Sequence, residues 1–251
     1  MRKKIVAGNW KMNTNLCEAV ELAKGIRERL SEVPSNVKLI VAPPFTNIES
    51  VEEILSGTPV AVAAQNCADH DKGAYTGEIS AKMIASCGCK YVILGHSERR
   101  TYYGETSAKI VEKMKLAFAA GLGVILCIGE NLDERNAGKH FEVTRKEIED
   151  VLFNFTAEDM ANVTVAYEPI WAIGTGVTAT SAQAEEIHAH VRKVIASEFG
   201  EKVADEMTIL YGGSCKPSNA KELFSCPDID GGLIGGAALK PDDFIAIAKS
   251  Y

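Results

Sequence analysis

Short, uninterrupted apolar runs recur along the whole chain and constrain its fold more than any other feature. Each run is followed by a polar turn and then, in most cases, by a segment with helical periodicity. Most runs are continuously apolar rather than alternating, which is typical of parallel strands covered on both faces. We therefore predict eight parallel strands, at Ile5–Gly8, Val37–Ala42, Val60–Gln65, Tyr91–Leu94, Gly123–Ile128, Val163–Tyr167, Met207–Tyr211 and Ile229–Ile234.

The segments between these runs repeat apolar residues with a period near 3.6, as helices with one buried face do. One helix is predicted to open at Asn15, with Glu18 completing a capping box, and another at Thr180 with Gln183. No composition shift or Ser/Pro-rich linker divides the 251 residues. We therefore predict one domain, residues 1–251, folded as a closed (β/α)₈ TIM barrel. The alternative, a doubly wound open sheet, would need fewer strands and a sign of a second domain.

Composition excludes several classes of function. A net charge of −7 argues against a general nucleic-acid surface and against a basic membrane-binding patch. The seven cysteines show no C-x-x-C spacing, which favours reduced thiols in the cytoplasm over disulfides or a zinc site. No segment is long enough for a signal peptide or a membrane span. The five histidines are dispersed, so we expect no metal ion and no other cofactor.

Chemistry in such a barrel lies at the carboxyl ends of the strands. Lys11 follows the first predicted strand, His96 the fourth and Glu168 the sixth. Each has an ordinary explanation, since a lysine can snorkel to the surface and a histidine can cap or pack. A helix predicted to start at Ser97 would disfavour imidazolium and keep His96 neutral. Together, the three residues predict a site at one end of the barrel.

Glycines follow the last two predicted strands, in Tyr211-Gly212-Gly213-Ser214 and Gly235-Gly236-Ala237. Such turns let a ligand approach backbone N–H groups, and barrels often bind phosphate there. Turn formation alone is the alternative explanation.

The stretch from Val163 to Ala179 carries a strand, a terminal carboxylate, a proline, Trp171 and a glycine-rich end. This pattern is consistent with a hinged lid over Glu168 or with an ordinary Gly/Pro loop. The glycine turns favour the lid, because they would give it a phosphate to close over.

The chain closely resembles the triosephosphate isomerase family, in tracts that follow the family's order from end to end. These tracts are Ala7–Asn13, Ala74–Ser80, Leu94–Arg100, Ala166–Gly176, Tyr211–Ser214 and Gly235–Ala237. The resemblance implies an enzyme that interconverts dihydroxyacetone phosphate and D-glyceraldehyde 3-phosphate, in glycolysis and gluconeogenesis. It also implies triose phosphates as ligands and a homodimer.

The resemblance also implies roles for particular residues. Glu168 is the implied general base, His96 the electrophile, Lys11 the phosphate and oxyanion partner, and Asn9 a positioning residue. The implied phosphate donors are Gly174, Ser214, Gly235 and Gly236, with Ser97 and Glu98 behind the reacting groups. Thr76 is implied to steady Asn9 and His96 across the dimer interface, with Glu78 and Arg99 in the same polar network. Val177, Tyr75 and Ile170 depart from residues common in the family.

Three other functions fit the sequence less well. A nicotinamide oxidoreductase is suggested by Gly174-x-Gly176-x-x-Ala179, but the first glycine lies well past the strand and no strand-end acid follows about twenty residues on. A barrel that binds a sugar phosphate without turning it over is opposed by the intact Lys11, His96 and Glu168. A metal-dependent aldolase is poorly supported, because His188 and His190 cannot share one helical face.

Overall fold

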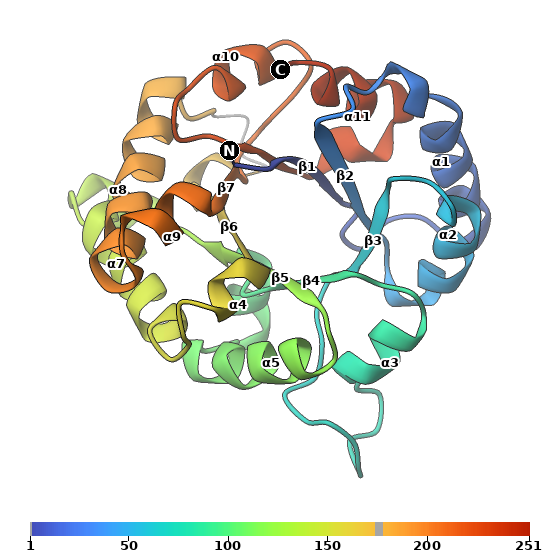
Figure 1. The fold of residues 1–251 in the computed structure, drawn as a ribbon, viewed down its shortest axis with the longest axis horizontal. Coiled ribbons are helices and arrows are strands. Elements are labelled where there is room, and N and C mark those ends of the chain that lie inside the picture. The colour runs from blue at the N-terminus through green and yellow to red at the C-terminus, as the bar shows by residue number, and fades with distance from the viewer. Residues whose placement is uncertain (1, 174–177) are drawn as a thin grey trace.

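A closed barrel of eight parallel strands lies inside a ring of helices in the computed structural model, which describes residues 2–173 and 178–251 (Figure 1). Each strand pairs with the next along the chain, and the last pairs with the first, so the barrel has no free edge. The strands are β1 (Lys4–Asn9), β2 (Val37–Ala42), β3 (Ala61–Ala64), β4 (Tyr91–Leu94), β5 (Gly123–Ile128), β6 (Val163–Tyr167), β7 (Thr208–Tyr211) and β8 (Gly231–Ile234).

The strand prediction is confirmed, with four sets of bounds unchanged. β1 is longer than predicted, while β3, β7 and β8 are shorter. β8 begins at Gly231, whose φ of 146° is open to glycine but strained for other residues. Alternate residues of a strand pack into two different hydrophobic cores, one inside the barrel and one between the barrel and the helices. In β5, Ile125 and Cys127 face the barrel interior, whereas their neighbours pack against the helices. This two-sided burial explains why the runs are continuously apolar.

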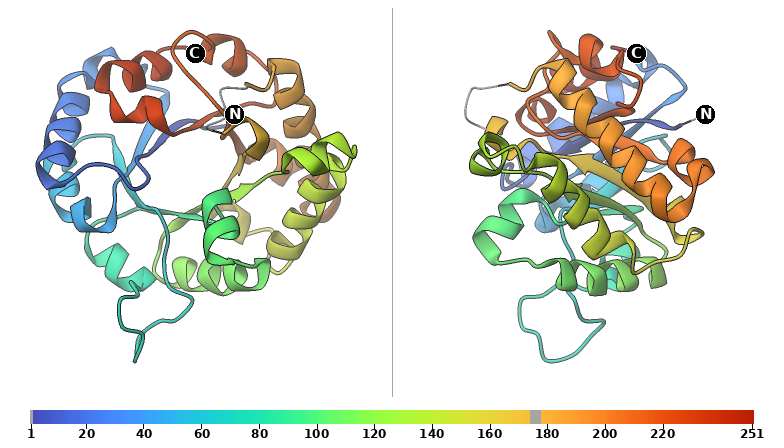
Figure 2. Two further views of the ribbon diagram at one scale, coloured as in Figure 1. Left: turned by 180° about the vertical axis from the view of Figure 1, so that it is seen from behind. Right: turned by 90° about the vertical axis from the view of Figure 1, so that its left-hand side faces the viewer.

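The helices cover the outside of the barrel, as Figures 1 and 2 show. They are α1 (Leu16–Glu28), α2 (Ile48–Leu55), α3 (Ala81–Ser86), α4 (Ser97–Tyr103), α5 (Ser107–Ala119), α6 (Leu132–Asn136), α7 (His140–Leu152), α8 (Ser181–Phe199), α9 (Glu201–Glu206), α10 (Ala220–Phe224) and α11 (Pro241–Ala248). Both predicted capping boxes are present, at the start of α1 and of α8. These two helices therefore start where the sequence predicts.

Residues 66–80, between β3 and α3, extend away from the ring of helices (Figures 1 and 2). Residues 72–78 within this segment are exposed, whereas residues 66–68 and Ser80 are buried. All seven cysteines lie in the described part of the chain and are free thiols. Among the described residues, no helix combines the length and hydrophobicity needed to cross a membrane.

Candidate active site

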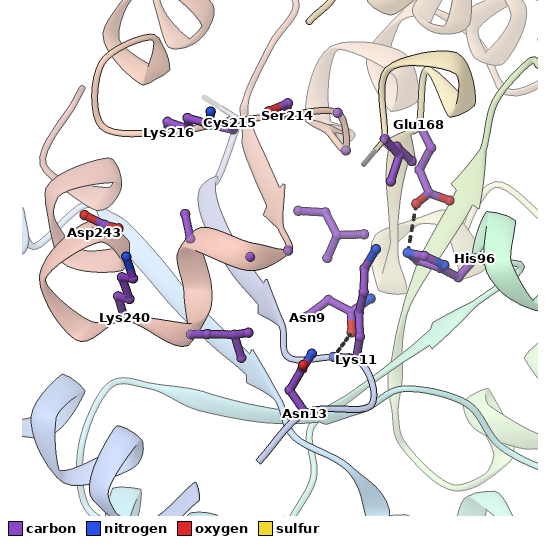
Figure 3. Close-up of a pocket in the computed structure, with 18 of the residues that line it drawn as sticks. Asn9, Lys11, Asn13, His96, Glu168, Ser214, Cys215, Lys216, Lys240 and Asp243 are labelled. Carbon is purple, nitrogen blue, oxygen red and sulfur yellow. Dashed lines mark hydrogen bonds and ion pairs between the residues drawn. The ribbon is translucent and has the colours of Figure 1, made fainter. Parts of the chain in front are cut away.

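A cavity of about 700 Å³ opens at the carboxyl ends of the strands, where the sequence predicts the site. Figure 3 shows side chains that enter it from several elements far apart in the sequence. Of the predicted site residues, those that line it are Asn9, Lys11, His96, Glu168, Ser214, Gly235 and Gly236. The barrel therefore brings together residues that are separated by more than two hundred positions.

Glu168 and His96 form the central contact of this cavity. Glu168 directly follows β6, and His96 caps the start of α4. His96 Nε2 lies 2.9 Å from Glu168 Oε1, and the backbone N–H of Ser97 donates to Glu168 Oε2 over 2.8 Å. Figure 3 shows the two side chains pointing toward each other. Both carboxylate oxygens are thus held at the start of a helix, where negative charge is favoured.

Burial and pairing act in opposite directions on Glu168. Burial raises its pKa, but the nearby His96 ring, the Ser97 N–H and the Lys11 ammonium outweigh burial and lower that pKa below its usual value. Glu168 is therefore a carboxylate at neutral pH, able to accept a proton.

The protonation of His96 follows from its hydrogen bonds. Burial lowers the pKa of His96, whereas the Glu168 carboxylate raises it and sets the net direction upward. The start of the helix at Ser97 alone predicts a lowered pKa for His96, and this predicted direction is therefore wrong. The backbone N–H of Glu98 nevertheless donates to His96 Nδ1 over 3.2 Å. That bond requires an unprotonated Nδ1, so the ring is neutral and its proton lies on Nε2, facing Glu168.

Lys11 lines the cavity and has an unusual backbone conformation. Its φ is 53°, a left-handed conformation that is uncommon for a residue with a side chain. Asn9 Oδ1 accepts from the Lys11 N–H over 3.0 Å, and Lys11 Nζ donates to Glu98 Oε1 over 2.8 Å. The ammonium therefore lies in the cavity with a carboxylate partner on α4, the helix that His96 caps.

Gln65 is a site residue that the sequence does not predict, and the structure places it against the backbone of Lys11. Its amide donates to the Lys11 carbonyl and to the Ala42 carbonyl, each over 2.9 Å. Gln65 thus holds the strained turn at Lys11 in place. Its position as the last, polar residue of an otherwise apolar predicted strand is the signal that could have identified it.

The glycine turns complete the lining of the cavity, where Gly212 packs against Glu168 and Gly235 lies beside Lys11. A Cβ on Gly236 would meet open space, and one on Gly235 would lie 4.0 Å from Lys11 Nζ. Space for an anion therefore exists beside the backbone of Gly235 and Gly236 and within reach of the lysine. Gly174, the remaining predicted phosphate donor, lies outside the described residues, as do Gly176 and Val177.

The first part of the predicted lid is held by a buried carboxylate, Glu130. Its Oε1 accepts from the Tyr167 hydroxyl over 3.0 Å and from Trp171 Nε1 over 2.9 Å. The segment directly after Glu168 is thus anchored to the loop that follows β5. The glycine-rich end of the predicted lid includes residues 174–177, which are outside the described part of the chain.

The remaining predicted residues lie in three different places. Ser97 and Glu98 contact Glu168, His96 and Lys11, as described above. Thr76 and Glu78 are exposed on the projecting segment 66–80 and do not line the cavity. Arg99 lies 3.4 Å from the buried carboxylate of Glu105.

Comparisons with known proteins agree over the full length of the chain. The family model described as triosephosphate isomerase matches residues 4–251. The chain is 55% identical over 251 residues to the triosephosphate isomerase of Bacteroides fragilis, covering all of both chains. Its identity is 54% to the enzyme of Porphyromonas gingivalis and 56% to that of Phocaeicola vulgatus, again over 251 residues and the whole of each chain.

Proposed function

The chain belongs to the triosephosphate isomerase family and has that family's activity, and we propose that Glu168, His96, Lys11 and Asn9 carry out its chemistry. The reaction moves a proton between two neighbouring carbons of dihydroxyacetone phosphate and D-glyceraldehyde 3-phosphate, in glycolysis and gluconeogenesis. The single observation that best supports the residue assignment is the 2.9 Å contact between His96 Nε2 and Glu168 Oε1 inside the cavity. An ionised base and a neutral N–H donor are the two groups that this proton transfer requires.

The proposed mechanism assigns each group one task. Glu168 removes a proton from one carbon and returns it to the next. His96 donates from Nε2 to the oxygen on which negative charge develops and relays the hydroxyl proton to it from the neighbouring oxygen, and the Lys11 ammonium stabilises the same enediolate. In the structure, the Glu168 carboxylate accepts from the Ser97 N–H and contacts His96 Nε2. It must therefore exchange these bonds for the substrate carbon, which makes it a stronger base.

We also propose where the substrate phosphate binds. The backbone N–H groups of Ser214, Gly235 and Gly236 would donate to it, with Lys11 adding positive charge. Gly174 would supply a further donor, by resemblance only. A phosphate here is remote from the reacting carbons, so its binding energy can hold the substrate in the reactive orientation.

Solvent-deuterium exchange tests the proton transfer directly. The protein, incubated with dihydroxyacetone phosphate in D₂O, should place deuterium on the carbon next to the carbonyl and release labelled glyceraldehyde 3-phosphate. A barrel that only binds sugar phosphates would incorporate no deuterium above the uncatalysed rate.

The active unit is proposed to be a homodimer, located in the cytoplasm. Segment 66–80 projects from the barrel and carries Thr76 and Glu78. Tyr75 within it and Met83 just beyond it are 45% and 54% exposed, which is typical of large apolar side chains that a partner covers. Seven free thiols support a reducing compartment.

The dimer proposal predicts the behaviour of Thr76→Arg. A charged, bulky side chain at the tip of the projecting segment should prevent docking, so sedimentation equilibrium should give the monomer mass of 27.0 kDa rather than about twice that value. If Thr76 steadies the partner's Asn9 and His96, kcat should also fall, by about tenfold or more. Ala157→Arg, at an exposed turn before β6, is the matched control. A Thr76→Arg protein that stays dimeric and fully active would contradict the assignment.

A further inference from the structure

A second ion pair lies beneath the active site, between Arg100 on α4 and Glu147 on α7. Arg100 Nε is 3.5 Å from Glu147 Oε1. The two side chains are only 16% and 18% exposed. Neither lines the cavity, so neither can touch a substrate. Arg100 nevertheless contacts the backbone beside His96, and Glu147 contacts backbone that packs on Glu168.

Arg100 binds the backbone next to His96. Its Nε donates to the carbonyl of Gly95, the residue before His96, over 2.9 Å, and its Nη2 donates to the Cys127 carbonyl over 3.4 Å. The guanidinium approaches Gly95 so closely that a Cβ there would lie 3.1 Å from Nη2. Arg100 therefore joins the carboxyl end of β4 to that of β5.

Glu147 binds the backbone next to Glu168. Its Oε2 accepts from the Gly129 N–H over 2.8 Å. Gly129 packs so tightly on Glu168 that an added Cβ would collide with the Glu168 carbonyl oxygen. The Glu168 N–H in turn donates to the Ile128 carbonyl over 2.7 Å. One carboxylate thus supports β5 and, through Gly129, the end of β6.

We propose that Glu147 is a positioning residue, which acts through Arg100 and Gly129 to set the distance between His96 and Glu168. The inference rests on the assignment of His96 and Glu168 as the reacting pair. An ordinary ion pair on the same helix, Arg145 with Glu149 at 3.1 Å, lies at the surface. Buried contacts to the backbone beside two reacting groups distinguish Arg100 and Glu147 from that pair.

The charge on Glu147 depends on pH close to neutrality. Burial raises the pKa of Glu147 to about 7, against the opposing effects of Arg100 and the Gly129 N–H. The other charged groups that face it are Glu168, at the end of β6, and Glu134 on α6, and both raise this pKa further. Above pH 7 the carboxylate is ionised and pairs with Arg100, whereas below pH 7 that attraction is lost.

The Glu147→Gln variant mimics the protonated carboxyl group. It keeps an oxygen that can accept from Gly129 but removes the charge that holds Arg100. At pH 8.5 we expect kcat to fall by about tenfold, with KM changed by less than about threefold, because a small misplacement of reacting groups slows the chemistry more than binding. The matched control is Glu149→Gln, which removes a carboxylate from the same helix and should keep wild-type kcat.

The ratio of the two kcat values, Glu147→Gln over wild type, separates positioning from a merely structural role. It should approach one below pH 6, where wild-type Glu147 is also neutral, and fall to a plateau above pH 8. Titration of the substrate cancels in this ratio. A ratio that does not vary with pH, or a kcat equal to that of Glu149→Gln, would overturn the proposal.

A spectroscopic measurement keeps the test independent of stability. In ¹⁵N-histidine-labelled protein without substrate, Glu147→Gln should shift the Nε2 signal of His96 and leave that of the buried His188 unchanged. Unchanged signals for both residues would count against the proposal. Activity near wild type in Glu168→Gln would refute the assignment of His96 and Glu168 as the reacting pair, on which this proposal rests. If Glu168→Gln is inactive but Glu147→Gln is fully active, only the positioning role of Glu147 is overturned.

Discussion

Replacing Glu168 with glutamine should lower kcat by about 10³-fold or more and leave KM within a few-fold of wild type. Such a loss corresponds to at least ~4 kcal/mol of transition-state stabilisation. Glutamine has nearly the same shape and can still accept from the Ser97 N–H, which now bonds Glu168 over 2.8 Å. It cannot accept a proton from carbon. A coupled assay in both directions of the reaction measures the effect.

Binding of a phosphate-bearing inhibitor is the control for this variant. Since Lys11 and the glycine turns are unchanged, calorimetry should still detect the inhibitor. Deuterium exchange into dihydroxyacetone phosphate should disappear together with turnover. Near-normal activity in Glu168→Gln would show that another group removes the proton and would refute the assignment of the base.

The sequence predicts the barrel well because its strands are buried on both faces. In β5, for example, the barrel interior needs Ile125 and Cys127 while the helices need the residues between them, so the run has no polar gap. The starts of β7 and β8 are less well predicted. Ile229 is apolar and buried, but the ladder begins only at Gly231. Burial alone thus does not distinguish a strand from the residues that lead into it.

The sequence predicts those site residues that come shortly after a strand. Lys11, His96 and Glu168 stand out because charged or titratable groups there interrupt apolar runs. The pair of Arg100 and Glu147 has no such signal, since Glu147 reads as one of several charged positions on α7. Its contacts to Gly95 and Gly129 depend on how the helices pack on the barrel, which local patterns do not encode.

The same limit applies to protonation. The helix that begins at Ser97 is visible in the sequence, and by itself it disfavours a charged His96. The Glu168 carboxylate, 71 residues away in the chain from Ser97, reverses the direction of the pKa shift. Only the bond from the Glu98 N–H to Nδ1 then identifies the tautomer. Local sequence predicts the helix, whereas the electrostatics depend on the closed barrel.

Lys11→Met is expected to impair both binding and chemistry, because the ammonium serves the phosphate and the enediolate at once. Methionine has a similar length and removes the charge. We expect KM to rise by about tenfold or more and kcat to fall by about 10²-fold, as for the loss of a charged donor in a partly buried site. Steady-state kinetics at fixed ionic strength measures both parameters.

The backbone of Lys11 makes this variant a demanding test, and the structure supplies its controls. The strained φ of 53° is fixed by Asn9 Oδ1 and by the Gln65 amide, neither of which contacts the Lys11 ammonium. The turn should therefore persist in Lys11→Met, and thermal unfolding should stay close to wild type. Lys24→Met changes net charge equally but removes only an exposed pair with Glu21, so its kinetics should not change. An unchanged KM in Lys11→Met would contradict the phosphate role, while an unchanged kcat would leave the enediolate to His96 alone.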